Sequence, residues 1–536
     1  MNSLLVVSFA FFIFWFGYVV YAEKINRIFK PDPNKKTPAH FNYDGVDFVP
    51  ARHWSMLFGH HFASIAGAAP IIGPILAVSI WGWAPTLLWV VLGTVFIGGI
   101  HDYCSLMVSV RHKGHSIADF AQTTISKNAK IIFLSFVWLA LILVVSVFVN
   151  VCAKTLVVKP QIVYPSIGLI PVALLVGFLL YAKKNHQILV TIGGLGLLAG
   201  LIYLGARYPI VLPVSDPIKA WSVVLLLYAY IASVCPVNIL LQPRDYLSTF
   251  LLLAGLVFGY IGIIAHKPVL SFPAFISVKP GQATMLWPVL FVTVACGAIS
   301  GFHSLVASGT TSKQLSNEVY AKRTGYGAMV AEGLLAVLAL LVVASAYSHV
   351  PELKIAMASG GGPVSVFGYG YGKVTESFLG KFGGLFAILV LNAFILTTLD
   401  TATRIGRYIT QELFSVKNRY LATLVVIALS GWLGLSGEWN EIWPVFGAAN
   451  QLIAALALIV ITSWFLSTNK PIRYTLPPTV FMLITTVAAL VLKIREYMIS
   501  KNSVLLTISF ILLGLAFFVL YEAVFVCMKN YKRGEV

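Results

Sequence analysis

The stretch HHFASIAGAAPIIGPIL, residues 60–76, is apolar enough for a membrane helix, yet Gly67, Pro70, Gly73 and Pro74 interrupt its middle. Proline removes a backbone donor and clashes with the preceding helical turn. In hydrocarbon, each backbone group freed in this way costs several kcal/mol unless a partner satisfies it. Such a break persists where the backbone lines a cavity or binds a ligand. We therefore expect an unwound helix at a binding site, with a simple proline kink as the alternative.

The rest of the chain is equally apolar. Of its 536 residues, 59% are hydrophobic and only 10% are charged, whereas a soluble globular chain is about a quarter charged. A bilayer-spanning helix needs about 20 apolar residues, and runs of that length recur from end to end. We predict an all-α polytopic membrane protein with about 15 transmembrane helices. The predicted spans are 2–20, 56–79, 84–108, 130–150, 168–182, 188–205, 221–241, 247–265, 284–311, 325–347, 383–401, 420–436, 442–466, 476–493 and 503–527.

The charges indicate an orientation. The net charge is +18, and most cation clusters lie in short loops that face one side if every predicted span crosses, with Lys493, Arg495 and Lys501 as the densest exception. By the positive-inside rule that side is cytoplasmic, which places the N-terminus outside and the C-terminus in the cytoplasm. The cations on that side include Lys24, Arg111, Lys183, Lys184, Lys313, Arg404, Lys470 and Arg533, whereas Asp216, Glu352, Glu438 and Glu441 fall on the other. Nucleic-acid binding would need a basic face, so we predict no nucleic-acid partner. We expect lipid and a small-molecule substrate instead, and the oligomeric state stays open.

Two further polar stretches point to an internal repeat. Pro236 and Pro243 interrupt YAYIASVCPVNILLQPRDYLS, residues 228–248, and hydroxyl groups crowd CGAISGFHSLVASGTTSKQL, residues 296–315. Five helices followed by five of opposite orientation, each group led by a broken helix, is the inverted repeat of LeuT-type transporters. We predict that fold, with one extra N-terminal helix and several extra C-terminal helices. The predicted units are an extra helix (1–22), a cytoplasmic loop (23–55), the first repeat (56–205), the second repeat (206–401), additional helices (402–466), and a C-terminal helix pair with a basic tail (467–536).

Ionisable residues lie at a similar depth in four different spans. At the helical rise, His101 and His303 lie about 15 Å inward of Arg111 and Lys313, respectively. His60 and His61 lie about 12–13 Å inward of Arg52, and Glu332 lies about 13 Å inward of Arg323. In an apolar core about 30 Å thick, these groups are near the midplane. Because a charged group facing lipid there costs at least about 2.5–3.5 kcal/mol, a shared polar cavity explains them best. The alternative for any single histidine is a neutral packing residue.

Such a cavity allows several chemistries. Histidine suits a proton relay because it titrates near physiological pH, so we assign proton coupling to His101, Asp102 and Glu332. The metal alternative is a zinc site built from His60, His61, His101, Asp102 and His303, although their spacing matches no zinc motif. The sodium alternative uses Ser308, Thr311 and the backbone near Ala66. We predict no resident cofactor and no enzymatic activity. No phosphate-binding loop is present either, so the energy must come from an ion gradient unless the protein is a channel or sensor.

Two acid–base pairs are candidate gates. Asp400 precedes Arg404 by four residues, so the two side chains meet on one helix face, and Arg244 adjoins Asp245. Each pair either caps a helix end or opens and closes with the transport cycle.

Seven segments resemble the carbon starvation protein A (CstA) family. They cover the chain from residue 60 to about 452, and they are long and polar within an apolar background. They are HHFASIAGAAPIIGPILA, GGIHDYCSLMVSVRHKGHSI, QPRDYLS, CGAISGFHSLVASGTTSKQL, GYGAMVAEG, LTTLDTATR and WPVFGAANQL. The resemblance implies a prokaryotic inner-membrane importer that is induced when preferred carbon is scarce. Members of this family are described as taking up peptides, and close relatives as proton-coupled pyruvate symporters.

Peptide and pyruvate both carry a carboxylate, which helix N-termini exposed at the breaks can bind. A peptide also needs an acid for its amine, which Glu332 or Asp102 could supply, and we favour peptides slightly. On this basis we expect alternating-access, proton-coupled import of small carboxylate-bearing nutrients. The residues expected to bind the substrate are His60, His61, Ser64, Gly67, Ala68, Pro70, Asn238, Ser300 and His303.

Overall fold

The computed structural model describes residues 1–124, 126–182, 186–279, 285–359, 361–435 and 439–532. Apart from one bridge between Asn2 and Val269, every regular element in these ranges is a helix. Twelve helices there are long and apolar enough to cross a membrane, and Arg419–Leu435 and Leu505–Phe518 are shorter apolar helices. These helices confirm the polytopic all-α prediction. The charged residues Lys183, Lys184, Glu438 and Arg533 lie outside the described ranges.

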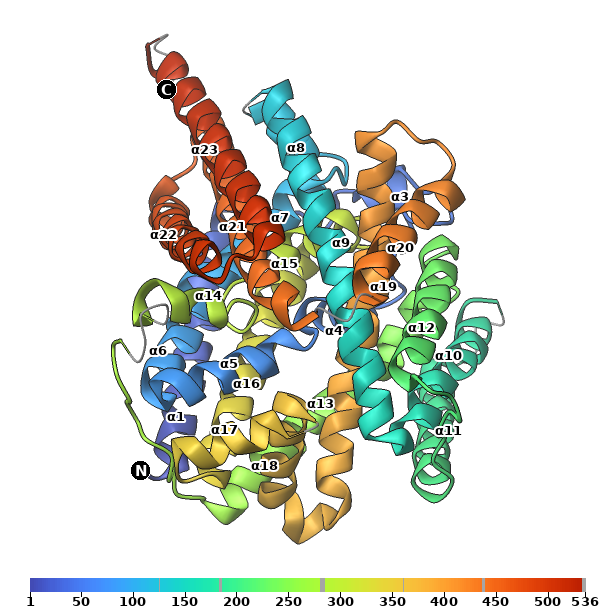
Figure 1. Ribbon diagram of the computed structural model, residues 1–536. Coiled ribbons are helices and arrows are strands. Elements are labelled where there is room, and N and C mark those ends of the chain that lie inside the picture. The colour runs from blue at the N-terminus through green and yellow to red at the C-terminus, as the bar shows by residue number, and fades with distance from the viewer. Residues whose placement is uncertain (125, 183–185, 280–284, 360, 436–438, 533–536) are drawn as a thin grey trace.

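The N-terminal half is a series of long helices with short connections (Figure 1). The first one continues past residue 22, since its π-helical turn η1 leads directly into α2. The elements are α1 (Ser3–Phe16), η1 (Gly17–Tyr21), α2 (Ala22–Phe29), α3 (Pro38–Phe41), α4 (Trp54–Ala66), α5 (Ala69–Trp81), α6 (Trp83–Gly93), η2 (Thr94–Gly98), α7 (Gly99–Arg111), α8 (Ile117–Thr124), α9 (Lys127–Val158), η3 (Pro160–Ile162), α10 (Val163–Gly177), η4 (Phe178–Ala182), α11 (Gln187–Arg207), α12 (Pro217–Val234) and α13 (Leu241–His266).

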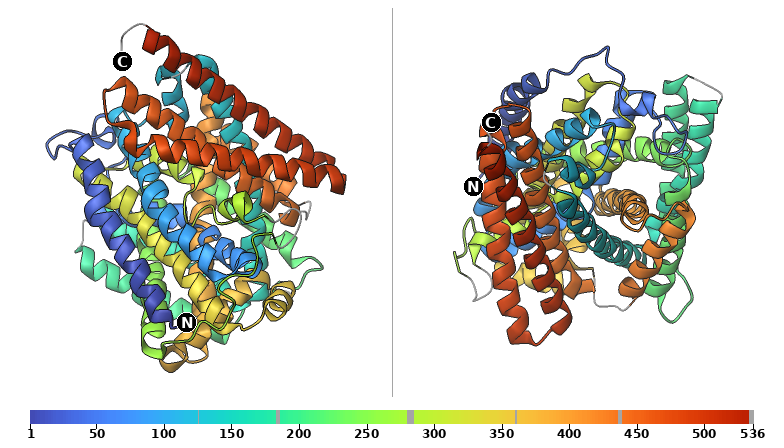
Figure 2. Two further views of the ribbon diagram at one scale, coloured as in Figure 1. Left: turned by 90° about the vertical axis from the view of Figure 1, so that its left-hand side faces the viewer. Right: turned by 90° about the horizontal axis from the view of Figure 1, so that it is seen from above.

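The C-terminal half is built in the same way. It contains η5 (Leu286–Leu290), α14 (Phe291–Thr293), α15 (Gly301–Gly309), η6 (Thr311–Lys313), η7 (Glu318–Tyr320), α16 (Ala321–Ala346), α17 (Val350–Ala358), α18 (Gly362–Leu379), α19 (Phe382–Leu413), α20 (Arg419–Leu435), α21 (Trp439–Ser467), η8 (Ile472–Tyr474), α22 (Leu476–Ser500) and α23 (Ser503–Lys532). The hairpins α10–α11 and α22–α23 lie at opposite edges of the molecule (Figures 1 and 2).

The first predicted break is present. Helix α4 ends at Ala66, and α5 begins at Ala69 with Pro70 in its first turn. Gly67 joins them with φ 55° and ψ −148°, a backbone conformation that is essentially restricted to glycine. Pro74 is accommodated inside α5. The chain therefore unwinds at Gly67 and Ala68, ahead of the two prolines.

The second break lies elsewhere than predicted. Helix α12 ends at Val234, before Pro236, and Pro243 sits in the first turn of the separate helix α13. The interrupted span is the predicted 284–311, which is not one helix: η5 and α14 end at Thr293, and α15 begins only at Gly301. Polar side chains from neighbouring helices satisfy its freed backbone. The carbonyls of Val294 and Gly297 accept from Trp89 and Thr94, respectively.

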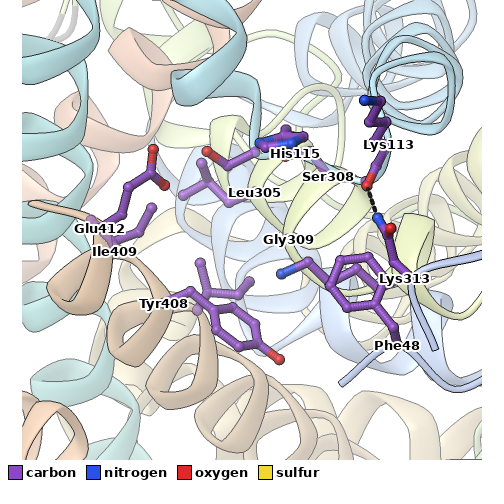
Figure 3. A pocket seen from close by; sticks show the side chains of 14 residues that line it. Phe48, Lys113, His115, Leu305, Ser308, Gly309, Lys313, Tyr408, Ile409 and Glu412 are labelled. Carbon is purple, nitrogen blue, oxygen red and sulfur yellow. Dashed lines mark hydrogen bonds between the residues drawn. The ribbon is translucent and has the colours of Figure 1, made fainter. Parts of the chain in front are cut away.

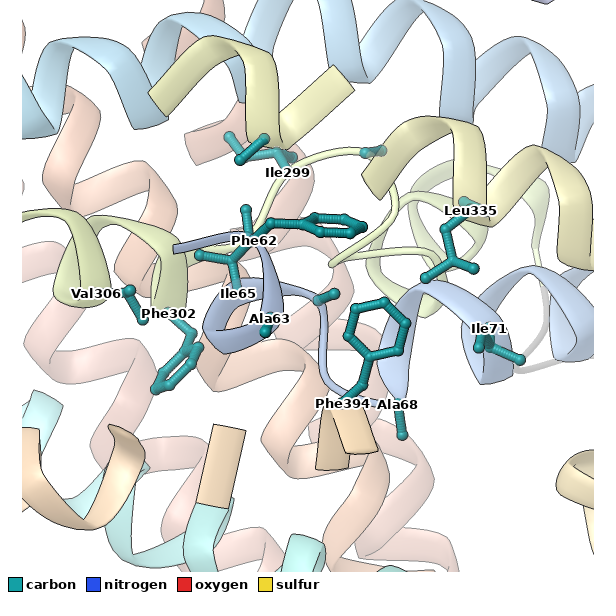
Figure 4. Close-up of a cluster of buried hydrophobic side chains, with 14 of the residues drawn as sticks. Phe62, Ala63, Ile65, Ala68, Ile71, Ile299, Phe302, Val306, Leu335 and Phe394 are labelled. Carbon is teal, nitrogen blue, oxygen red and sulfur yellow. The ribbon is translucent and has the colours of Figure 1, made fainter. Parts of the chain in front are cut away.

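The two breaks pack against each other. A Cβ added at Gly73 would lie 2.8 Å from the Thr293 carbonyl oxygen, and one added at Gly297 would lie 3.6 Å from Pro70 Cα. Apolar side chains of both broken helices meet beside them, as Figure 4 shows for Phe62, Ile65 and Ile299. Two interrupted helices therefore cross at their unwound segments in the centre of the bundle.

The backbone at Gly67 provides a test of the first break. We expect Gly67→Ala to destabilise the protein by about 1–3 kcal/mol, because alanine disfavours this conformation. Its Cβ would also lie only 3.1 Å from Thr398 Oγ1. The thermal unfolding midpoint of the purified protein measures the change. Gly196→Ala on α11, where an added Cβ meets nothing within 4 Å, is the matched control. Equal midpoints for the two variants would contradict the assigned break.

Candidate functional site

A cluster of four ionisable side chains lies beside the breaks. Asp102 accepts hydrogen bonds from His101 Nδ1 at 2.8 Å and from His303 Nδ1 at 2.9 Å. His303 Nε2 lies 3.2 Å from Glu332 Oε2. All four side chains are fully buried, and they come from α7, α15 and α16. The structure thus brings the predicted proton-coupling residues together with His303, and we call these four residues the proton cluster.

The hydrogen bonds restrict where protons reside in this cluster. Because a carboxylate only accepts, each histidine bound to Asp102 carries a proton on Nδ1. The free position is the gap between His303 Nε2 and the Glu332 carboxyl group, whose two oxygens have no other hydrogen-bond partner among the described residues. With one proton shared in that gap, the cluster has a net charge of −1. A second proton makes it neutral, which is the better state in a low-dielectric interior.

His60 belongs to a second network. Its Nδ1 donates to Asp245 Oδ2 at 2.6 Å, and its Nε2 lies 3.1 Å from Thr310 Oγ1. Gln314 Nε2 donates to the same hydroxyl at 2.8 Å. These partners support the neutral tautomer with the proton on Nδ1. His61, the adjacent residue, instead bonds Thr311 Oγ1 at 2.8 Å, so the paired histidines serve different partners.

The predicted Asp400–Arg404 pair is not formed. Asp400 pairs with Arg244, and it accepts a hydrogen bond from the Tyr228 hydroxyl at 2.6 Å. Arg244 also pairs with Asp245, as predicted, with Nη2 to Oδ1 at 2.6 Å. The arginine thus lies between two buried carboxylates from α13 and α19. For Asp400, the pair with Arg244 of another helix replaces the predicted pair with Arg404, because a buried carboxylate needs a charged partner.

Arg404 belongs to a latch in which the loop residue Asp47 pairs with two arginines of α19. Its Nη1 pairs with Asp47 Oδ1 at 2.7 Å, and Arg407 Nη2 pairs with the same oxygen at 2.9 Å. Arg404 Nη2 also donates to the carbonyls of Ala232 and Cys235 at the end of α12. We call the Asp47–Arg404–Arg407 contact the latch. It closes the end of the bundle where most of the loop cations lie, hereafter the basic end, at the top of Figure 1.

The latch stays charged over a wide pH range. Burial opposes the charged form of Asp47, but the charges of Arg407 and Arg404 outweigh it and lower the pKa of Asp47 to about 2. A carboxyl group whose pKa is depressed on folding stabilises the folded state above its unfolded value of about 3.9, and this stabilisation is lost as the pH falls toward 2. Physiological pH changes therefore leave the latch intact.

The remaining predicted binding residues fall into two groups. Ser64, Gly67, Ala68 and Pro70 line the first break, where Ser64 Oγ bonds Thr401 Oγ1 at 2.9 Å. Ser300 lies at the second break and donates to Asn450 Oδ1 at 3.0 Å. Asn238 is not part of this region. It lies in the turn between α12 and α13, where the neighbouring Val237 N–H bonds the Val46 carbonyl of the latch loop.

The sodium and metal alternatives gain less support. Ser308 Oγ donates to the Ser304 carbonyl, whereas Thr311 is engaged with His61, so the two hydroxyls serve separate contacts. The expected zinc set is divided, because His60 belongs to the second network. In the described part of the chain, one group has three metal-ligand atoms all within 4.8 Å of one another, namely Cys296, His303 and Glu332.

Sequence reasoning missed several side chains that hold the second break and the latch. Asn450 accepts from the Phe302 N–H at 2.8 Å at the start of α15, and Gln451 donates to the carbonyls of Phe291 and Ile299. Their signal was the polar Asn–Gln pair inside the apolar motif WPVFGAANQL. Asp47 gave no comparable signal in the sequence, since it is one of several acidic residues in a polar loop.

Two cavities flank the centre. One, of about 200 Å³, approaches the breaks from the end opposite the latch and is lined by Ala69, Trp81, Cys296, Asn450 and Lys493, among others. The other, of about 370 Å³, lies at the basic end between α15, α19 and the loop after α7 (Figure 3). The breaks and the proton cluster thus lie between two chambers that open toward opposite ends.

Comparison with known proteins agrees with this arrangement. A family model described as "Carbon starvation protein CstA" matches residues 2–351 and 345–489. The "Peptide transporter CstA" of Escherichia coli (strain K12) is 33% identical, and the alignment covers 90% of this chain and 80% of that protein. Its counterpart in Campylobacter jejuni is 31% identical over 90% of this chain and 79% of the relative. The "Pyruvate/proton symporter BtsT" of Escherichia coli is 30% identical over 90% and 80% of the two chains.

Solved structures share the fold at low sequence identity. The Eremococcus coleocola manganese transporter, in complex with an aromatic bis-isothiourea compound, aligns with 90% of this chain and 99% of its own at a TM-score of 0.54 and 13% identity. MhsT in complex with L-phenylalanine aligns with 88% and 99% of the two chains at a TM-score of 0.52 and 14% identity. Both are LeuT-fold transporters, so the predicted LeuT-like fold is confirmed.

Removing Arg244 tests the buried charge network. We expect Arg244→Met to cost about 3–5 kcal/mol of stability, because it removes the cation that lies between two buried carboxylates. Adding Asp400→Asn should recover part of that loss, as a double-mutant cycle would show. The exposed pair Lys219–Asp216 is the comparison, and Lys219→Met should change the stability far less, because an exposed ion pair contributes little. If Arg244→Met unfolds at the wild-type midpoint, the pairing is wrong.

The latch predicts a change in access. In a Ser308→Cys background, we expect Asp47→Asn to raise the rate of alkylation by a membrane-impermeant maleimide severalfold, because the two arginines lose their shared anion. The parent background should label at a constant rate from about pH 6 to 8 when the reagent's own pH dependence is subtracted, since the pKa of Asp47 is about 2. Asp44→Asn, an exposed acid in the same loop, is the control. Equal rates for Asp47→Asn and Asp44→Asn would contradict the latch.

Proposed function

Because this chain belongs to the carbon starvation protein CstA family, whose curated relatives are membrane transporters, we propose that it imports small carboxylate-bearing nutrients, peptides or pyruvate, together with protons. The protein is a secondary transporter of LeuT-like fold, not an enzyme. We place it in a prokaryotic inner membrane with the basic end in the cytoplasm, following the positive-inside rule. The N-terminus then lies outside.

The observation that carries this proposal is the open position between His303 Nε2 and Glu332. A secondary transporter needs a buried group that can bind and release its coupling ion as access alternates. The two Glu332 oxygens are fully buried and lack hydrogen bonds among the described residues. A proton bound there reduces the negative charge of the proton cluster, so the loaded form can be enclosed at lower cost than the unloaded form. The relative named as a pyruvate/proton symporter is in line with proton coupling.

The carboxylate of the nutrient fits the first break. Helix α5 begins there with no side-chain cap on its first N–H groups, and a helix N-terminus attracts anions. The second break differs, because Asn450 already caps Phe302 at the start of α15. The cavity of about 200 Å³ at the opposite end from the latch reaches Ala69, the first residue of α5. The nutrient would enter from outside through this cavity.

The packing of the helices supports an internal repeat. Helix α16 packs on α5 as α7 packs on α15, and α13 packs on α4 as α21 packs on α14. Likewise, α20 packs on α9 as α12 packs on α19. These matched pairs support repeats of residues 54–266 and 286–467, each led by a broken helix, with the α10–α11 hairpin inserted in the first. We infer this division rather than one between residues 205 and 206.

Glu332→Gln tests the coupling. In proteoliposomes, the variant should lose concentrative uptake driven by an inward proton gradient, because glutamine cannot carry the proton. It should keep part of the exchange of labelled substrate, which needs no net proton transfer. Glu376→Gln, an exposed acid on α18, is the matched control. If gradient-driven uptake by Glu332→Gln equals that of the wild type, Glu332 is structural.

The choice of substrate and ion is tested in the same vesicles. Wild-type protein should accumulate pyruvate or L-alanyl-L-alanine under a proton gradient and not under a sodium gradient alone. Accumulation under sodium alone would contradict proton coupling, and transport of neither compound would contradict the substrate class. Failure to exchange any labelled nutrient would indicate a channel or sensor.

A further inference from the structure

The cavity of about 370 Å³ at the basic end holds an unusual cation. Lys313 points into it, with its ammonium 3.8 Å from the centre of the Tyr408 ring and 5.2 Å from that of Phe48. Within the described part of the chain, the Lys313 ammonium has no ion pair and no hydrogen bond. Burial lowers the pKa of Lys313 to about 8. An ammonium that lacks an anion inside a chamber is a ready site for an anionic ligand.

The charges around the chamber favour an anion too. On the Lys313 side, Asp47 already pairs with both Arg404 and Arg407. Lys313 is therefore a third cation near a single, already paired carboxylate. Tyr408 lies between Arg407, 4.5 Å from the ring centre, and Lys313. On the opposite wall, Glu412 is already paired with Lys130 at 2.9 Å. Figure 3 shows the Lys313 amine over Tyr408, facing the interior, with Glu412 across the chamber.

The chamber adjoins the transport path. Leu305, Ser308 and Gly309 of α15 line it, and His303 of the proton cluster lies on the same helix. At the helical rise, Ser308 is about 7.5 Å further along α15 than His303. The latch residue Arg404 directly precedes Ile405, which also lines the chamber. A ligand released from the midplane toward the basic end would therefore enter this space.

We propose that the chamber is a second substrate station, in which Lys313 binds the carboxylate of the nutrient on its way to the cytoplasm. This inference rests on the proposed function for the identity of the ligand. The ammonium supplies a charge-assisted hydrogen bond to the carboxylate, and the aromatic walls of Phe48 and Tyr408 cover the apolar part of the ligand. Release then follows when the latch opens.

The test measures affinity separately at the two faces. In vesicles of defined orientation, Lys313→Met should raise the half-saturating concentration of pyruvate or L-alanyl-L-alanine at the cytoplasmic face by at least about tenfold, the effect of losing a charged hydrogen bond. The value at the outer face should change by less than about twofold, because the first break binds there. Lys313→Arg should retain most of the affinity. Lys417→Met is the matched control, since that lysine is exposed and does not line the chamber.

A second measurement separates this inference from the proposed function. In the purified protein, saturating pyruvate should slow acylation of Lys313 by an amine-reactive ester relative to the exposed Lys417, and methyl pyruvate should not, because it lacks the carboxylate. L-alanyl-L-alanine and its amide form a second such pair. If the wild type transports neither compound, the proposed function fails, and protection of Lys313 still decides whether the chamber binds carboxylates.

Two outcomes would overturn the inference. If no carboxylate protects Lys313 and Lys313→Met keeps the wild-type affinity at both faces, the chamber is not a binding site. If carboxylates protect Lys313 while the cytoplasmic half-saturation stays unchanged, the site lies off the transport path.

Discussion

The structure depends on unwound backbone being tolerated inside a bilayer. Peptide groups released from a helix have no water to bond there, so each needs a partner from another element. At the second break, side chains provide these partners, with Trp89 and Thr94 bonding carbonyls and Asn450 bonding an N–H group. At the first break, Thr398 bonds the Ser64 carbonyl, and the N-terminus of α5 lacks a side-chain cap. One break is therefore sealed by the protein, whereas the other is left able to bind a ligand.

This difference explains what could be predicted from sequence. The first break was recognisable because Gly67, Pro70, Gly73 and Pro74 oppose a helix by their own chemistry. The second was misplaced, because the 294–300 segment contains no proline and is unwound by partners such as Asn450, which lie about 150 residues away in the chain. The histidines and Glu332 were found from depth alone, since any ionisable group at that depth needs a polar site. The sequence could not predict which of these groups pair with one another. Asp400 shows this, because Arg404 is its neighbour on the same helix but Arg244 from another helix is its partner.

The buried charges form three groups with different properties. Arg244 holds Asp245 and Asp400, and the latch holds Asp47 between two arginines, so every charge in these two groups has an opposite partner. Such groups join α13, α19 and the loop before α4, and they break only when those elements separate. The proton cluster differs because it has two carboxylates and two histidines with room for one more proton. The first two groups suit conformational gates, and the third suits an ion-binding site.

The arrangement of these groups also links binding to access. The cluster draws residues from α7, α15 and α16, while the latch joins the loop before α4 to α19 and the end of α12. Helix α15 connects the two regions, since His303 lies in the cluster and Leu305, Ser308 and Gly309 line the chamber beside the latch. Protonation of His303 or Glu332 changes the electrostatic free energy of burying the first half of α15. A displacement of α15 in response would also move its second half, which lines the chamber at the basic end. Because α15 is nine residues long and follows an unwound segment, it is a short helix separate from α14, and a displacement of it requires breaking few helical hydrogen bonds beyond the contact of Phe302 with Asn450.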